Sequence, residues 1–381
     1  MLARSFRACH QDIPFFVLLA DEPVAAVDPA AEPFTLVTLA DLDVPDLPRL
    51  RFHHPQQPFS YACTPWLIEW LHARGVDRVV YFKQETLILD DVSGLFDRLA
   101  TSPIVVTPHL PQPLGADGAE RELNILLSGV YNVGVLGVAR HASAREFLTW
   151  WADRLRYDCR HAVEAGLHFE QRWVDLAIAY FDGVHVERDP AYNVGHWSLP
   201  ERAVTRAADG RVQVDGRPCR VFRFSGYRPE EGDRMTTYNA RLPWEGLGVV
   251  RELVRGFREA LEHDGYWETR EWPYAYERFD NGVRVAETAR QIYRTQGDAV
   301  ARFGDPLSTG GSGSFWRWLH SHPPESDLSR FWKAIYDSRP DLQGAFPDTR
   351  GDGARAFMTW ARHSGLAEHQ VPEAMLTGSD R

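Results

Sequence analysis

The chain has 381 residues and a formal net charge of -11 at pH 7; 44% of its residues are hydrophobic and 25% are charged. This apolar fraction excludes a long disordered chain, because disordered segments hold too few apolar residues to form a core. The acidity argues against nucleic acid as a partner, since binding it without sequence preference requires a basic face.

The first two thirds of the chain alternate short apolar runs with amphipathic stretches. Strands are predicted at residues 15–19, 34–39, 78–82, 104–107 and 130–138, and helices at 65–73 and 142–157. This alternation predicts an α/β domain of the layered Rossmann type with a mostly parallel central sheet.

After about Tyr238 the pattern becomes helical, with helices predicted at residues 247–263, 283–293 and 328–336. A Gly- and Ser-rich run at 308–314 lacks the lysine of a phosphate-binding P-loop and predicts a flexible loop. We therefore expect a sheet-containing domain at 1–240 and a helical C-terminal extension at 241–381 that packs on it.

The sequence predicts a cytoplasmic protein without a membrane span. The opening residues lack the apolar core of a signal peptide, and the early apolar run at 15–20 is too short to cross a bilayer. The four cysteines are far apart and form no CxxC pair. This spacing favours reduced thiols over a zinc site or a disulfide framework.

Polar residues follow the predicted strand at 78–82 directly, as Lys83-Gln84-Glu85. In open α/β sheets, ligands bind at the carboxyl ends of the strands, so these side chains are candidates for a binding site. The alternative is a strand that simply leaves the core.

Two further blocks combine amide, carboxylate and glycine residues. Asn132 and Gly134 lie within a predicted strand, where glycine indicates the close approach of a ligand or backbone, or else a β-bulge. Glu170 and Gln171 lie at a predicted helix start, where the carboxylate either serves a site or interacts with the helix dipole.

The last block places Arg223 between two phenylalanines and ends in Ser225-Gly226. An arginine at a strand end suits the binding of a diphosphate; the alternative is a surface arginine. His109 and His196 are candidates for the acceptor side of a site, or else structural histidines.

Taken in order, these blocks resemble a family of bacterial nucleotide-diphospho-sugar transferases with the GT-A fold, distantly similar to glycogenin-like enzymes. The resemblance covers roughly Ser5 to Gly226 and includes Thr107-Pro108-His109 and the tandem Trp150-Trp151. It implies a single GT-A-like domain that moves a hexose from a nucleotide-diphosphate donor to an acceptor. The glycogenin-like kinship favours retention of the anomeric configuration.

The chain departs from the family pattern at the two places that usually supply ligands for a divalent cation. Lys83-Gln84-Glu85 replaces an Asp-x-Asp motif, and Arg223 replaces a histidine. Charged lysine and arginine cannot ligate a metal, but they can neutralise a diphosphate directly. We therefore expect no metal and no cofactor besides the donor substrate.

The resemblance also implies a nucleotide-binding first strand ahead of the helix that begins near Leu2, and the sequence lacks one. Either the start of the sequence lies downstream of that strand, or the pocket for the base is built differently.

The leading hypothesis is thus a metal-independent glycosyltransferase whose catalytic residues are Lys83, Arg223, Glu170 and Gln171. The donor-binding residues would be Gln84, Glu85, Asn132, Gly134, Ser225 and Gly226, with His109 and His196 on the acceptor side. The acceptor, whether a glycan, a lipid-linked molecule, a small molecule or a protein, is left open. The runner-up is a catalytically inactive GT-A relative that binds or scaffolds. A sugar nucleotidyltransferase would need a glycine-rich loop near the N-terminus, which is missing here.

Overall fold

A computed structural model describes residues 1–238 and 242–377, which fall into two units. Unit 1 comprises Met1–Asp43 and Ser60–Trp272, and unit 2 comprises Val44–Phe59 and Pro273–Arg381. The predicted boundary between residues 240 and 241 lies outside the described residues. The division instead follows Trp272, so the helix predicted at 247–263 belongs to unit 1.

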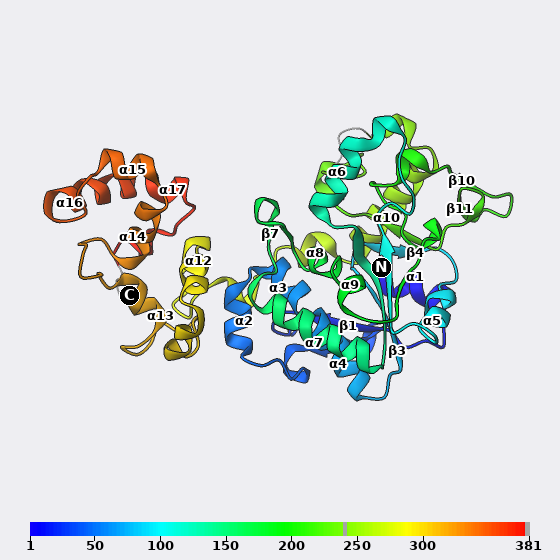
Figure 1. Cartoon of the computed structure of the whole chain (residues 1–381), viewed down its shortest axis with the longest axis horizontal. Coiled ribbons are helices and arrows are strands. Elements are labelled where there is room, and N and C mark those ends of the chain that lie inside the picture. The colour runs from blue at the N-terminus through cyan, green and yellow to red at the C-terminus, as the bar shows by residue number, and fades with distance from the viewer. Residues whose placement is uncertain (239–241, 378–381) are drawn as a thin grey trace. The chain divides into compact units, whose positions relative to one another are not determined.

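The central sheet of unit 1 has four strands in the order β3 (Arg78–Phe82), β6 (Tyr131–Ala139), β5 (Ile104–Pro108) and β9 (Val184–Val186). Strands β3, β5 and β9 share one direction, and β6 runs antiparallel between β3 and β5. The predicted α/β fold is confirmed, and three of the four strands of this sheet point the same way. Figure 1 shows helices and strands together in unit 1.

Four smaller sheets complete the strands described in unit 1. Strand β1 (Phe16–Leu19) pairs in parallel with β2 (Thr35–Thr38), and β13 (Val221–Arg223) pairs antiparallel with β4 (Thr86–Ile88). The remaining strands are β7 (His161–Ala162), β8 (Leu167–His168), β10 (Val204–Arg206), β11 (Val212–Val214) and β12 (Arg217–Pro218).

Several helices of unit 1 pack on the rest of the unit through an apolar stripe. Helix α7 (Ala142–Tyr157) buries Phe147, Leu148, Trp151 and Leu155 and packs on α4 (Thr64–Ala73). The other α-helices of unit 1 are α1 (Leu2–Cys9), α5 (Ser93–Arg98), α6 (Ala119–Ser128), α8 (Gln171–Val174), α9 (Ala177–Tyr180), α10 (Val249–His263) and α11 (Tyr266–Thr269). Helix α3 (Gln56–Ala62) spans the division after Phe59.

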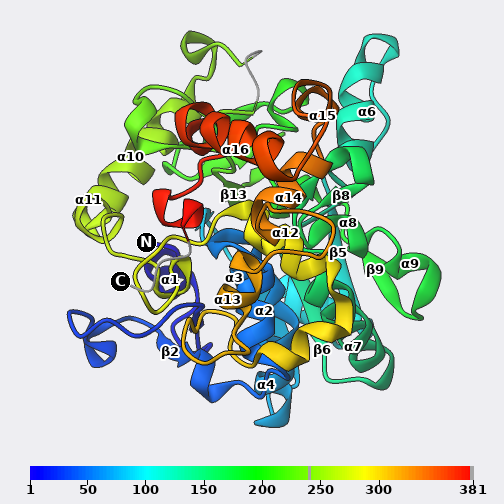
Figure 2. The same ribbon diagram turned by 90° about the vertical axis from the view of Figure 1, so that its left-hand side faces the viewer.

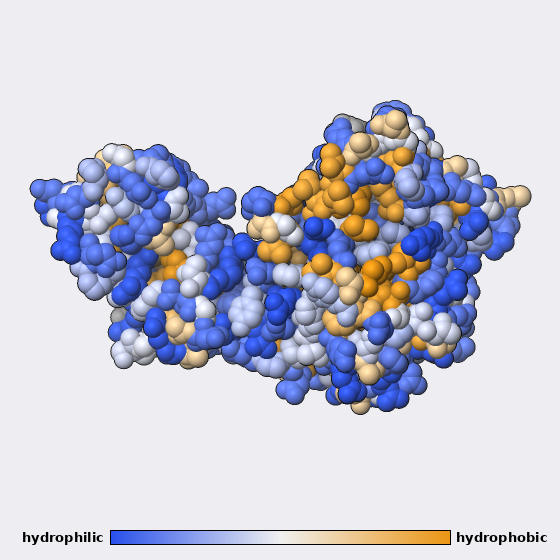
Figure 3. Space-filling model, viewed as in Figure 1, coloured by the Kyte–Doolittle hydropathy of each residue, from blue (hydrophilic) through white to orange (hydrophobic). Residues whose placement is uncertain are grey.

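Helix α6 has ten residues, and none of them is buried. Leu123, Leu126 and Leu127 are at least half exposed, and Figure 3 shows apolar surface in the region of this helix. Neither α6 nor β4 was predicted from the sequence.

Unit 2 is helical, as the sequence predicts for the C-terminal part, and its C-terminal helices run from yellow to red in Figure 2. Its α-helices are α2 (Leu47–His53), α12 (Glu287–Thr295), α13 (Phe315–His320), α14 (Arg330–Asp337), α15 (Pro340–Ala345), α16 (Gly351–Trp360) and α17 (Leu366–Glu368). Aromatic side chains form much of its core, including Phe52, Tyr293 and Phe315 in edge-to-face contact. Within residues 1–238 and 242–377, no helix is long and apolar enough to cross a membrane.

Candidate functional site

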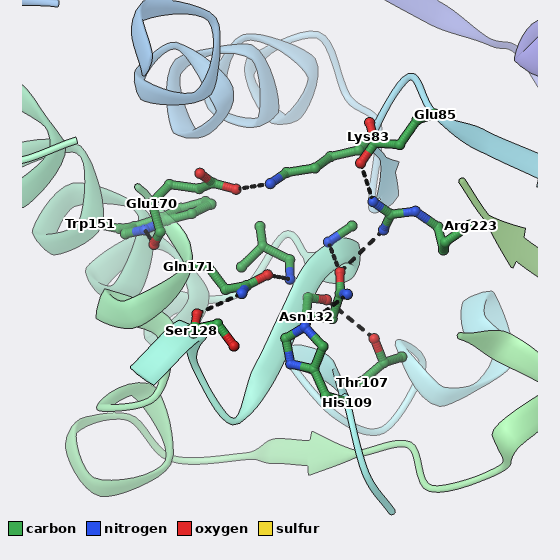
Figure 4. Close-up of polar contacts among 12 residues, drawn as sticks. Lys83, Glu85, Thr107, His109, Ser128, Asn132, Trp151, Glu170, Gln171 and Arg223 are labelled. Atoms are coloured by element: carbon green, nitrogen blue, oxygen red, sulfur yellow. Dashed lines mark hydrogen bonds and ion pairs between the residues drawn. The ribbon is translucent and has the colours of Figure 1, made fainter. Parts of the chain in front are cut away.

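The predicted site residues gather mainly at one edge of the central sheet of unit 1 (Figure 4). Lys83 follows β3, His109 follows β5, and Asn132 lies near the start of β6. Because β6 runs antiparallel to β3 and β5, its first residues lie at the same edge as the last residues of those strands. Arg223, at the end of β13, reaches this edge through the pairing of β13 with β4.

Arg223 is a buried cation at the centre of this group, with only 1% of its surface exposed. One guanidinium nitrogen donates to a Glu85 carboxylate oxygen at 2.5 Å. The other donates to the amide oxygen of Asn132 at 3.2 Å. Asn132 Oδ1 also accepts the backbone N–H of Gly134 at 2.7 Å, so this amide fixes the guanidinium against strand β6.

Gly134 provides the space that the guanidinium occupies. A Cβ at this position would lie 1.0 Å from Arg223 Nη1, so any larger residue would displace the arginine. The sequence predicted the close approach of a ligand or another backbone at this glycine, or else a β-bulge; the group beside it in the structure is instead the side chain of Arg223.

Lys83 forms the second ion pair. Its ammonium lies 2.5 Å from Glu170, whose side chain is 1% exposed, and 4.0 Å from the centre of the Tyr61 ring. Burial alone would lower the pKa of Lys83, but the negative charge of Glu170, supported by Tyr61 and Glu85, raises it above its ordinary value. Lys83 is therefore charged at neutral pH.

Glu85 connects the two cations electrostatically. Burial raises the pKa of the Glu85 carboxyl. The positive charges of Arg223 and then Lys83 lower it by more than burial raises it, so the pKa lies below its ordinary value. Its side chain is 22% exposed, whereas Glu170 is almost completely enclosed. Of the two carboxylates, Glu85 is thus the one with access to solvent.

Glu170 and Gln171 anchor helix α8 beside this cluster. The Glu170 carbonyl accepts the indole N–H of Trp151 at 3.1 Å. Gln171 accepts the backbone N–H of Val133 at 3.2 Å and donates to the Ser128 carbonyl at 2.7 Å. Its amide therefore ties α8 to β6 and to the end of α6.

Both predicted acceptor-side histidines lie close to this cluster. His109 is buried; its Nε2 lies 3.1 Å from Asn132 Nδ2, and its ring meets Trp197 edge to face. Burial, and then His196, lowers the pKa of His109 to about 3. Burial, and then Arg223, lowers the pKa of His196 to about 4. Both are neutral at pH 7.

Three predicted donor-binding residues form no hydrogen bond or ion pair with Lys83 or Arg223. Gln84 is exposed and lines a neighbouring apolar cavity. The Ser225 carbonyl accepts from Thr236, and Gly226 has a positive φ of 75° with Thr236 and Tyr238 packed against it. Tyr61 was not predicted as a site residue, because an aromatic residue in a helix gives no signal for a distant lysine.

The resemblance implies a divalent cation here, but the side chains present do not suit one. Charged Lys83 and Arg223 offer no lone pair, and Glu85 and Glu170 each lie 2.5 Å from a cationic nitrogen. Across residues 1–238 and 242–377, no group of three or more His, Cys, Asp or Glu side chains is placed to hold a metal ion. Metal independence itself stays a prediction.

Comparison with protein-family models gives no match for this chain. Two uncharacterized proteins of Bacillus subtilis (strain 168) are similar to it. YfnF is 24% identical over 232 residues, which is 60% of this chain and 76% of YfnF. YfnD is 23% identical over 204 residues, which is 51% of this chain and 62% of YfnD.

Among solved structures, the galactosyltransferase LgtC in complex with donor and acceptor sugar analogs aligns with a TM-score of 0.40 and 14% identity. The alignment covers 68% of this chain and 89% of LgtC. A glycosyltransferase involved in glycosylation of the major capsid of PBCV-1 gives a TM-score of 0.31 and 11% identity, covering 58% and 84%. Scores below 0.5 leave function to be argued from the site itself.

Proposed function

We propose that the cluster around Lys83 and Arg223 binds the diphosphate of a nucleotide sugar, and that the protein transfers the sugar to an acceptor hydroxyl without a divalent cation. The observation that supports this most directly is the presence of two fixed, buried cations at one sheet edge, one of them beside a partly exposed carboxylate. Their combined charge of two equals that of the divalent cation they would replace.

The two ion pairs differ in how readily they admit a phosphate. Glu85 reaches solvent, so it can turn away and let a phosphate oxygen take its place on Arg223. Glu170 is enclosed and stays with Lys83, which can direct another of its three N–H donors at the ligand. The planar guanidinium of an arginine can donate two parallel N–H bonds to the oxygens of one phosphate. Arg223 would therefore be the main contact of the diphosphate.

In the proposed reaction, the bond between the anomeric carbon and the diphosphate oxygen breaks, and the diphosphate leaves with the electron pair. The acceptor oxygen bonds to the anomeric carbon and loses its proton to solvent. Lys83 and Arg223 stabilise the negative charge that develops on the leaving group. Asn132 and Glu170 hold Arg223 and Lys83 in place, and Gln171 holds β6, so all three act as positioning residues. Retention of configuration is the expectation from the family resemblance.

The test is a panel of nucleotide-diphosphate sugars, assayed for binding by thermal shift and for transfer or hydrolysis, all in excess EDTA. A donor that binds the folded state raises the melting temperature. We expect binding and turnover to persist in EDTA. Turnover that EDTA abolishes and Mg²⁺ or Mn²⁺ restores would contradict the replacement of the metal by Lys83 and Arg223.

A double variant distinguishes the loss of the Lys83 charge from a general loss of stability. Lys83→Met alone leaves the Glu170 carboxylate buried without a cationic partner. An uncompensated buried charge strongly destabilises a folded protein. The double variant Lys83→Met/Glu170→Gln removes both charges, so no uncompensated charge is left buried and the fold is not destabilised in this way. We expect the double variant to fold but to lose donor hydrolysis by about 10²–10³-fold.

A second candidate is a relative that binds a nucleotide sugar without turnover. The observation that favours it is that both cations are already neutralised at 2.5 Å by carboxylates of the protein. Donor binding without hydrolysis, and without transfer to any of a broad set of acceptors, would support this candidate over the transferase.

A further inference from the structure

A cavity of about 720 Å³ in unit 1 lies along strand edges rather than on a sheet face. All five residues of β3 line it, as do Phe16, Val17 and Leu18 of β1. Side chains alternate between the two faces of a strand, so a cavity that contacts every residue in succession borders the edge of the strand. We refer to this cavity as the β1–β3 slot.

The backbone of β3 presents free hydrogen-bonding positions to this slot. Lys83 N–H donates to Gly134 and Arg140 N–H donates to Asp77, in an antiparallel register that pairs Tyr81 with Leu136. In such a ladder, alternate residues bond to the partner strand. The odd-numbered residues of β3 therefore bond to β6, and the N–H and C=O groups of Val80 and Phe82 point to the opposite edge.

The same reasoning applies to β1. Thr35 N–H donates to the Phe15 carbonyl, and β1 runs parallel to β2. Phe15 and Val17 therefore bond to β2, while the backbone groups of Phe16 and Leu18 point away from it. In the part of the chain that the structure describes, β1 pairs only with β2 and β3 pairs only with β6. Two strand edges thus border one apolar cavity, where unpaired backbone groups are costly.

The side chains that line the slot are mostly apolar. Helix α1 contributes Leu2 and Phe6, and helix α4 contributes Leu67, Ile68 and Leu71. Polar lining residues include Asp77, Arg78 and Gln84, which lie at the two ends of β3. Large apolar residues of the strands, such as Phe16 and Phe82, are only partly buried although they belong to sheets.

We propose that the β1–β3 slot binds an extended apolar β-strand, which would join β1 and β3 into one continuous sheet. An added strand offers N–H and C=O groups to both edges at once, which an apolar small molecule cannot do. To follow the five residues of β3, it would span about 17 Å. Because apolar residues line the slot from both helices, its side chains would be apolar on both faces, as in strands rich in Val and Ile.

Met1 provides a way to supply such a strand, because Met1 lines the slot and is followed by α1 and then β1. A strand fused ahead of Met1 would form a strand–helix–strand unit with α1 and β1, the usual connection between parallel neighbours. The experiment fuses about seven Val- and Ile-rich residues to Met1 through a short Gly-Ser linker. The control fusion has the same length, with proline at alternate positions, which cannot form the ladder.

Hydrogen exchange and thermal unfolding are measured for both fusions, and for the unextended protein with the same strand added as a free peptide. We expect the amides of Val80, Phe82, Phe16 and Leu18 to exchange at least about tenfold more slowly with the strand than with the proline control. The melting temperature should likewise be higher with the strand than with the proline control.

Two outcomes would overturn the proposal. One is that neither the fusion nor the free peptide protects these four amides. The other is that an apolar dye such as ANS raises the melting temperature while the strand does not, which would make the cavity a small-molecule pocket. The proposal is independent of the sugar-transfer function, because none of its measurements uses a donor.

Discussion

Two buried arginines, one in each unit, are held in different ways. Arg290 in unit 2 is 3% exposed and donates to the backbone carbonyls of Arg51, Phe52, His54 and Tyr276 at 2.7–3.2 Å. Arg223 in unit 1 is 1% exposed and donates to side chains, the carboxylate of Glu85 and the amide of Asn132.

The difference in partners separates a structural cation from a candidate binding cation. The carbonyls around Arg290 belong to α2, to His54 directly after it and to the 3-10 helix Ala275–Glu277, so their positions are fixed by the backbone. Burial lowers the pKa of Arg290 to about 10, which still leaves it charged at pH 7. Glu85, in contrast, is a partly exposed side chain that can rotate, so Arg223 can exchange it for a ligand.

The largest expected effect on stability is that of Arg290→Met. The substitution leaves four carbonyls without this donor in a buried region, at a cost of about 3 kcal/mol or more in the free energy of unfolding. Urea unfolding followed by tryptophan fluorescence measures this loss. Arg362→Met, at an exposed arginine of the same unit, is the matched control and should cost almost nothing. A loss below about 1 kcal/mol for Arg290→Met would contradict the structural role.

Arg223→Met should reduce activity strongly and stability only slightly, whereas Arg290→Met should mainly reduce stability. Glu85 can be hydrated once its partner is gone, so we expect a loss of only about 1–2 kcal/mol in the free energy of unfolding. Donor hydrolysis or transfer should fall by about 10²–10³-fold, because the leaving group loses its main cation. Arg228→Met, at an exposed arginine five residues on, is the control. Equal stability losses at Arg223 and Arg290 would remove the distinction drawn between them.

Gly134→Ala tests whether Arg223 depends on the space beside β6. The added methyl would overlap Arg223 Nη1, and forcing such overlap typically costs about 1–3 kcal/mol. In an Arg223→Ala background the space is empty, so the same substitution should cost at least about 1 kcal/mol less. Urea unfolding of the four proteins in this cycle measures the coupling. Additive losses would mean that the guanidinium does not occupy this position.

The sequence predicted the regular parts of unit 1 well, because their patterns are local. The strand at Arg78–Phe82 and the helix at Ala142–Tyr157 have the predicted bounds, since a continuous apolar run and a helical stripe each define their own limits. Helix α6 was not predicted, although Leu123, Leu126 and Leu127 have the spacing of a helical face; in the structure these leucines are exposed rather than packed into the core.

The site was harder to predict than the fold, because its partners are distant in the sequence. Lys83 and Arg223 were named as a pair, but nothing local indicates that Glu170 pairs with one and Glu85 with the other. The role of Gly134 could be read only as a close approach, since the approaching side chain lies on a strand that pairs with β4, an element the sequence did not reveal.

Acid stability should depend on the histidines of unit 1. His109 and His196 have folded pKa values of about 3 and about 4, below the ordinary 6.5. Between those values and 6.5, the unfolded chain binds protons that the folded chain does not, so acidification lowers the free energy of unfolding. The slope approaches about 1.4 kcal/mol per pH unit for each histidine. His109→Gln should flatten the profile measured by urea unfolding, and His263→Gln, at an exposed histidine, should leave it unchanged.

The smallest expected effect is a change in the pKa of His196 when Arg223 is replaced. Arg223 is the second cause, after burial, of the low pKa of His196. Removing its charge in Arg223→Met should therefore raise the pKa of His196 toward 6.5, as measured by NMR titration of the imidazole. The gap between folded and unfolded pKa values narrows, so this histidine contributes less to acid destabilisation. Arg290→Met should leave the pKa of His196 unchanged. An unchanged pKa in Arg223→Met would show that the guanidinium charge is fully compensated by Glu85, which would weaken the case that it is available to a diphosphate.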